Sequence, residues 1–183
     1  MAGLQAAFLL ARGRADGLRY IEQDMAGAAR SFWAVLVCLP AIVCLRLMDW
    51  VEFGLPQPDA AHAFALDILA YLIGWAGFLL LTWYLAPFFG VRGRWPQFVV
   101  AWNWCNVIEN MLLVLGSLPG LLGAPTILAE AVQLFAIGWA VWIEWFAIRL
   151  TLGVGGFVAA SLVILDQSIG LMLASWNFTI LHS

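Results

Sequence analysis

Residues 97–118 read QFVVAWNWCNVIENMLLVLGSL, a run in which Glu109 is the only charged side chain. An apolar run of about 20 residues is long enough to cross a bilayer as a helix. At about 100° per residue, Asn103, Asn106 and Asn110 share one narrow face of that helix, and Glu109 lies beside it. A polar face inside a membrane has to point toward other helices. The stretch therefore predicts one member of a transmembrane helix bundle.

The composition of the whole chain is that of a membrane protein. Of its 183 residues, 64% are apolar and 10% are charged, and the mean hydropathy is +0.95, whereas about a quarter of the residues of a soluble domain are charged. We predict an all-α fold, a polytopic membrane helix bundle with five transmembrane helices. The predicted spans cover residues 31–50, 62–88, 97–118, 126–149 and 157–181.

The predicted organisation is an N-terminal interfacial segment, residues 1–30, followed by a five-helix transmembrane domain, residues 31–183. Within residues 13–30, four apolar residues recur at helical spacing: Leu18, Ile21, Met25 and Ala29. Four charged residues lie opposite them: Arg14, Asp16, Glu22 and Asp24. This pattern predicts an amphipathic helix that lies along the membrane surface.

The arginines near the span ends predict the orientation of the chain. Most of them flank the same side of a five-span bundle: Arg12, Arg14, Arg19, Arg30, Arg92, Arg94 and Arg149. Arginine-rich loops stay in the cytoplasm. We therefore expect a multi-pass integral membrane protein with its N-terminus in the cytoplasm and its C-terminus on the opposite side. Arg46 opposes this bias, and Asp49, three residues later, can neutralise its charge.

Several classes of function are disfavoured by the residue types. Every basic residue is arginine, so the chain has no Walker-type lysine and no Schiff-base nucleophile. No basic stripe interleaved with aromatic residues points to nucleic acid. The three cysteines lie in apolar runs and there are only two histidines, which is too few ligands for a zinc site. We expect no catalytic motif, no metal and no cofactor.

Five carboxylates lie inside the predicted spans: Asp67, Glu109, Glu130, Glu144 and Asp166. A charged carboxylate at a helix centre costs about 2.5–3.5 kcal/mol on insertion scales. These groups must therefore be neutral, buried against other helices or bound to a cation. At about 1.5 Å per residue, Glu109 and Asp166 are expected near the midplane, Asp67 and Glu130 nearer the outer face, and Glu144 nearer the cytoplasmic face.

The polar faces of the last three spans are expected to converge. Glu130, Gln133 and Glu144 share a stripe of the fourth span with Ile137 and Val141. Five amides are predicted to make polar contacts between helices: Asn103, Asn106, Asn110, Gln133 and Asn177. On the fifth span, Gly170 and Ala174 have the small-x-x-x-small spacing that allows close helix packing, on the same face as Asp166.

Residues 145–153, WFAIRLTLG, lead through a short link into Ala159 and Ala160. This junction and the five-span layout resemble the Yip1-type five-helix membrane proteins and their bacterial relatives. The resemblance implies a membrane-organising or partner-binding protein without catalytic residues.

The leading hypothesis is a non-enzymatic integral membrane protein that organises lipid or docks against partner membrane proteins. Its partners would be membrane lipids and either the other subunits of a larger complex or further copies of itself. The alternative is a small proton or cation pathway through Glu109, Asp166 and Glu144, with Asp67 and Glu130 at the outer entrance. A third hypothesis, an intramembrane enzyme acting on a lipid, predicts a lateral opening near Trp102 or Trp142.

Overall fold

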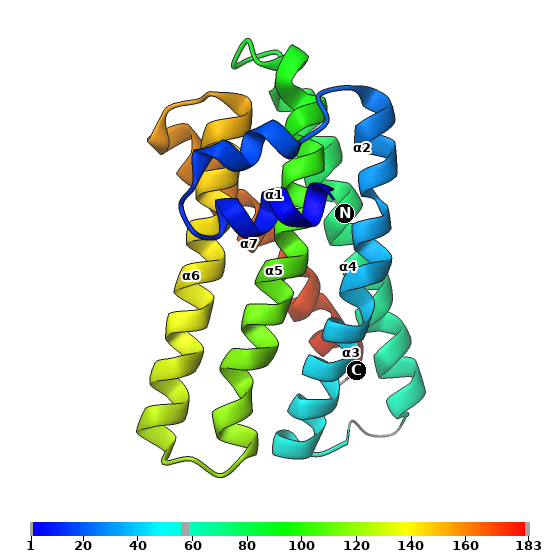
Figure 1. Cartoon of the computed structure of the whole chain (residues 1–183). Coiled ribbons are helices and arrows are strands. Elements are labelled where there is room, and N and C mark those ends of the chain that lie inside the picture. Colours follow the sequence, from blue (N-terminus) through cyan, green and yellow to red (C-terminus); the bar gives the residue numbers. More distant parts are fainter. Residues whose placement is uncertain (1, 56–58, 182–183) are drawn as a thin grey trace.

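A computed structural model describes residues 2–55 and 59–181. These residues form seven α-helices and two short 3-10 helices and contain no strand, which confirms the predicted all-α class. Five helices are long and apolar enough to cross a membrane and form the bundle in Figure 1. They are α3 (Trp33–Phe53), α4 (Ala60–Leu85), α5 (Trp95–Leu121), α6 (Thr126–Leu152) and α7 (Gly156–Leu181).

Helix α5 is the element around which the others pack. Its most extensive contact is with α6, and it also packs against α3, α1 (Ala2–Leu10) and α2 (Met25–Ser31). Phe98, Val99 and Cys105 of α5 are fully buried. Helix α7 runs behind the bundle in Figure 1 and packs against α6 and α4. The helix with the most polar residues in its centre is thus the most enclosed one.

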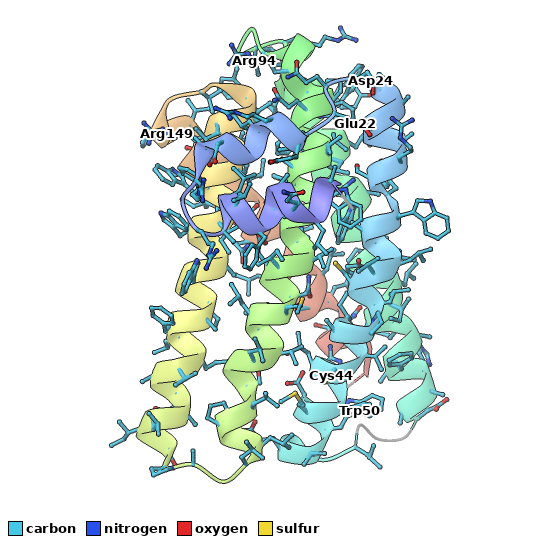
Figure 2. The ribbon with its side chains drawn as sticks, viewed as in Figure 1. Glu22, Asp24, Cys44, Trp50, Arg94 and Arg149 are labelled. Atoms are coloured by element: carbon cyan, nitrogen blue, oxygen red, sulfur yellow. The ribbon has the colours of Figure 1, made fainter. Side chains whose placement is uncertain are left out.

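The two ends of the bundle can be told apart by their labelled residues. Figure 2 shows Arg94 and Arg149 near one end, with Glu22 and Asp24 close by, and Trp50 near the other end. We call them the Arg94 end and the Trp50 end. The links between α4 and α5 and between α6 and α7 lie at the Arg94 end, and the link between α5 and α6 lies at the Trp50 end.

The N-terminal segment corrects the prediction of one continuous helix over residues 13–30. Residues Ala15–Tyr20 form a 3-10 helix, and Ile21 follows with an extended backbone and a buried side chain. Helix α2 then begins at Met25, because the Asp24 side chain accepts the backbone N–H of Gly27 at 2.7 Å. A side-chain cap of this kind favours a helix start. The segment therefore contains two short helices, Ala15–Tyr20 and Met25–Ser31, in place of one continuous helix.

Helix α1 is an element that the sequence analysis missed. In Figure 1 it lies across α5 instead of along it. Its residues Ala6, Ala7 and Leu10 are buried, and Gly3 lies so close to the Trp104 ring that a Cβ there would overlap it. The apolar run over residues 2–11 is too short to span a membrane, which is why it gave no signal as a helix of the bundle.

The first predicted loop is shorter than expected. The first span is predicted to end at residue 50, yet α3 continues through Glu52 to Phe53. Gly54 ends the helix with a φ of +89°, a conformation that glycine adopts without steric cost. Charged residues in the last turns of a helix do not break it, so the stop lies at the glycine. Residues 56–58 of the predicted loop lie outside the described residues.

The close helix crossing lies between α5 and α6, at Gly116. A Cβ at Gly116 would lie 2.6 Å from the Cβ of Ala136, closer than real Cβ atoms approach. Gly170 and Ala174 of α7, predicted to make such a crossing, are both exposed. No atom lies within 4 Å of a Cβ built at Gly170. Small residues permit close approach without enforcing it, and both residues border an open space between α7 and the helices α3, α4 and α5.

We predict that Gly116→Ala lowers the free energy of unfolding by about 1–3 kcal/mol, because the added methyl group overpacks the α5–α6 crossing. Gly170→Ala should leave it unchanged or raise it slightly, since alanine is the better helix former and the space is open. Equilibrium unfolding in detergent, followed by tryptophan fluorescence, measures both. Equal effects of the two substitutions would contradict the assignment of the crossing.

Candidate functional site

A cavity of about 820 Å³ lies between α3, α4, α5 and α7. It is lined by Asp49 and Gly54 toward the Trp50 end and by Trp102 and Asp166 toward the middle of the bundle. This space therefore connects one end of a membrane-spanning bundle with polar side chains at its centre. Pockets of about 300–1,000 Å³ are the usual size of small-molecule sites.

Three of the predicted carboxylates meet where this cavity ends. Asp166 of α7 lines the cavity and interacts electrostatically with Glu144 of α6. Glu109 of α5 interacts electrostatically with Asp166 and Glu144. We call these three residues the carboxyl cluster. The predicted convergence of α5, α6 and α7 thus brings Glu109, Glu144 and Asp166 together.

Glu144 is the most enclosed member of the carboxyl cluster, with 2% of its surface exposed. Its Oε1 accepts a hydrogen bond from Trp102 Nε1 at 3.3 Å, and its Oε2 accepts one from Gln167 Nε2 at 3.3 Å. Two neighbouring carboxyl groups in a membrane interior repel each other when both are ionised. We therefore expect Glu144 and Asp166 to share a proton.

Glu109 supplies the least satisfied polar atom of the bundle. Its Oε1 is buried and has no hydrogen-bond partner among the residues that the structure describes. Leaving a buried acceptor unsatisfied costs about 1–3 kcal/mol. An unsatisfied polar group inside a membrane indicates a candidate functional position. Glu109 also interacts electrostatically with Glu144 and Asp166.

A charge network lies in the outer part of the cavity. Arg46 Nη2 of α3 pairs with Asp67 Oδ1 of α4 at 2.7 Å, and Arg46 Nη1 donates to Asp49 Oδ2 at 3.3 Å. Asn177 Nδ2 of α7 donates to the same Asp67 oxygen at 3.4 Å. The sequence analysis paired Arg46 with Asp49 alone. The stronger pair with Asp67 joins two helices, and no sequence spacing reveals it.

Glu130 does not take part in the site, contrary to prediction. It is exposed in the first turns of α6, and Ile137 on the same stripe is 41% exposed. Helix α6 meets α7 after a short link at the Arg94 end, and α7 also packs against α4. In Figure 1 the red end of α7 lies away from α6. The stripe is therefore covered at Glu144 but not at Glu130.

Three of the five predicted amides make hydrogen bonds between helices. Asn103 is fully buried; it accepts from Trp75 Nε1 of α4 at 2.9 Å and donates to Ser31 Oγ of α2 at 2.7 Å. Gln133 Oε1 of α6 accepts from Ser117 Oγ of α5 at 3.0 Å. The third is Asn177, described above. The bonds of Asn103 and Gln133 join α5 to α4, α2 and α6, and the bond of Asn177 joins α7 to α4.

The other two amides correct the prediction. Asn106 Nδ2 donates to the Trp102 carbonyl at 2.9 Å, and Asn110 Nδ2 donates to the Asn106 carbonyl at 2.8 Å. Both bonds lie within α5 and not between helices. Both residues line the cavity, so the narrow amide face of α5 is directed toward open space instead of a neighbouring helix.

Aromatic side chains form the inner wall of the cavity and close it toward the Arg94 end. Tyr71, Trp75 and Trp102 line the cavity, with ring centroids 5.3 Å and 5.1 Å apart along the series. Phe78 packs on Trp102 at 5.0 Å and on Phe98 at 6.2 Å, and both phenylalanines are fully buried. The cavity is therefore a vestibule that ends at a packed aromatic core.

Comparisons with protein-family models, curated proteins and solved structures gave no match for this chain. Within residues 2–55 and 59–181, no group of three His, Cys, Asp or Glu side chains is arranged to hold a metal ion. The function is therefore inferred from the vestibule and the carboxyl cluster themselves.

We predict that Asp67→Asn lowers the free energy of unfolding more than Asp49→Asn does. The Asp67 carboxylate is 16% exposed and lies 2.7 Å from Arg46, whereas that of Asp49 is 52% exposed and lies 3.3 Å away. Breaking a partly buried pair should cost about 1–2 kcal/mol, and breaking an exposed one less than about 1 kcal/mol. Unfolding of both variants in detergent tests this order, and the reverse order would contradict it.

Proposed function

We propose that this protein is a small proton or cation pathway in which the carboxyl cluster exchanges protons with the vestibule. The observation that supports this proposal best is that the vestibule reaches Asp166, which interacts electrostatically with the buried Glu144. Ionisable residues at this depth are expensive in a membrane. A pair of neighbouring carboxyl groups that borders a cavity can bind a proton and exchange it with that cavity.

The charge distribution of the vestibule supports the transfer of a positive rather than a negative ion. Its basic residue, Arg46, is engaged by Asp67 and Asp49. Its inner end carries Asp166 with Glu144 behind it. An anion entering the vestibule would meet these acidic groups without an unpaired positive charge to balance them, and unlike-charge pairing favours a cation.

Glu109 is assigned the role of the acceptor beyond the Glu144–Asp166 pair. Glu109 has a buried oxygen without a hydrogen-bond partner among the described residues and interacts electrostatically with Asp166, so a proton that leaves Asp166 has a third carboxyl group within the bundle to occupy. The aromatic core of Phe78 and Phe98 separates this position from the Arg94 end. Passage across the whole membrane therefore includes a movement of that core, and exchange with the vestibule does not.

The arginine distribution indicates the direction. If the Arg94 end faces the cytoplasm, as the positive-inside rule predicts, the vestibule opens to the opposite side of the membrane. Asp67, predicted at the outer entrance, lines the vestibule, whereas Glu130 is excluded from this role by its exposure on α6.

Proton uptake into proteoliposomes tests the proposal. With a potassium gradient and valinomycin as the driving force, the wild-type protein should acidify vesicles that contain a pH-sensitive dye. Asp166→Asn and Glu109→Gln should reduce the rate to that of protein-free vesicles, because neither amide can release a proton in this pH range. Glu130→Gln, a matched loss of an acid on an exposed face, should leave the rate unchanged. Flux that persists in both cluster variants would exclude the pathway.

A second candidate function, the binding of membrane lipid, is supported by a groove on α6. The groove has a volume of about 530 Å³ and lies between the N-terminal segment and α6. It is lined by Ala11, Arg12, Phe135, Gly138, Trp139 and Trp142. Trp139 Nε1 donates to the Ala11 carbonyl at 3.0 Å and thereby joins the two segments. Apolar walls with an arginine at the edge suit an acyl chain and a phosphate headgroup.

We predict that Arg12→Gln reduces the amount of anionic phospholipid that copurifies with the protein by about fivefold, since one basic residue contributes about 1 kcal/mol near a charged lipid surface. Arg149→Gln serves as the matched control, because Arg149 lies over the Trp145 ring and outside the groove. Lipid extraction and mass spectrometry give the measurement. A loss of the same size in both variants would argue for a general charge effect and against the groove.

A further inference from the structure

The vestibule is far larger than a proton or a metal ion requires. Its volume of about 820 Å³ falls within the range of pockets that enclose drug-sized molecules, and a file of water molecules would serve a proton pathway in much less space. The size of the cavity is thus a property that the proposed function leaves unexplained. It points to an organic ligand.

The walls indicate what the body of such a ligand is. Tyr71, Trp75 and Trp102 line the cavity and pack edge to face on one another, and Trp50 lies nearer its outer end. Indole and phenol rings bury large apolar groups and attract cations to their faces. The aromatic content of the wall therefore favours an apolar ligand that carries a positive charge.

The polar groups of the wall are mainly acceptors. Asp166 lies at the inner end. Asn106 and Asn110 also line the cavity; each donates from Nδ2 to a carbonyl group of its own helix, so its Oδ1 remains as an acceptor. Arg46, the basic residue of the wall, is held by Asp67 and Asp49. Acceptors of this kind match the N–H groups of an ammonium ion.

We propose that the vestibule binds an organic cation, a protonated amine joined to an aromatic or aliphatic body. The body lies against Trp75 and Trp102, and the ammonium group lies at Asp166. Binding displaces the proton that the Glu144–Asp166 pair holds, so that one positive charge enters the site as one proton leaves it for bulk water. This inference rests on the proposed function, because Asp166 is the group that either the proton or the ammonium ion occupies.

The experiment compares two probes of equal shape. The protein is placed in nanodiscs of zwitterionic lipid and titrated with 2-(1-naphthyl)ethylammonium or with the uncharged 2-(1-naphthyl)ethanol, with empty nanodiscs as the blank. Calorimetry should give an affinity about tenfold or more higher for the amine, the range expected for a charge-assisted hydrogen bond. Asp166→Asn should bring the amine down to the affinity of the alcohol, and Glu130→Gln should leave the preference intact.

Equal binding of the two probes by the wild-type protein, or a preference for the amine that survives Asp166→Asn, would overturn the inference. The first comparison needs no variant, so it stands even where Asp166→Asn fails to fold. The proton-flux measurement separates the two proposals. Flux that depends on Asp166 without a preference for the amine refutes the ligand and keeps the pathway. An amine preference that depends on Asp166 without proton flux refutes the pathway.

Discussion

A carboxyl group surrounded by hydrocarbon must find a partner or a route to water, and this constraint organises the protein. Glu144 meets it with Trp102, Gln167 and Asp166. Because these partners come from α5 and α7, satisfying this one acid of α6 fixes the relation of all three helices. Charged side chains in soluble proteins rarely have this effect, since water can replace any partner that is lost. In a membrane the alternative is an unsatisfied group in lipid.

The same constraint explains why α5 lies at the centre. It carries Asn103, Asn106, Glu109 and Asn110 on adjoining faces, and each of these must be enclosed by protein. Asn103 is enclosed by α4 and α2 through hydrogen bonds, and Asn106 and Asn110 face the vestibule. The position of α7 then decides which acids belong to the site. Where it contacts α6, Glu144 is covered, and where it lies against α4, it frames the vestibule together with Asp67.

Two groups of charged residues line or adjoin the vestibule, and they differ in their effect on the stability of the bundle. At the outer part, Arg46 neutralises Asp67 and Asp49 and joins α3 to α4, which makes this pair a stabilising contact between helices. At the inner end, acids face acids, an arrangement that does not stabilise the bundle unless a proton or a cation is present. The stabilising charges and the candidate site thus lie at different depths of one cavity.

The residue pattern predicted the class of fold, the five long helices and the meeting of Glu109, Glu144 and Asp166, because hydrophobic length and helical periodicity are local properties of the chain. Other features were beyond its reach. The start of α2 at Asp24 depends on a single side-chain cap, and the end of α3 at Gly54 depends on a single glycine. Helix α1 is too short to give a clear periodic pattern in the sequence. The exposure of Glu130 and Gly170 depends on where α7 lies relative to α6.

By itself, then, the sequence determined which residues enter the membrane and which side of each helix is polar. Only the tertiary structure decided that Arg46 pairs with Asp67, that Asn106 and Asn110 face a cavity instead of a helix, and that Gly116 makes the close crossing. The physical reason is that periodicity describes one helix at a time. Which helix a polar face contacts depends on the angles at which the helices cross. Those angles are set by side-chain packing along the full length of each helix.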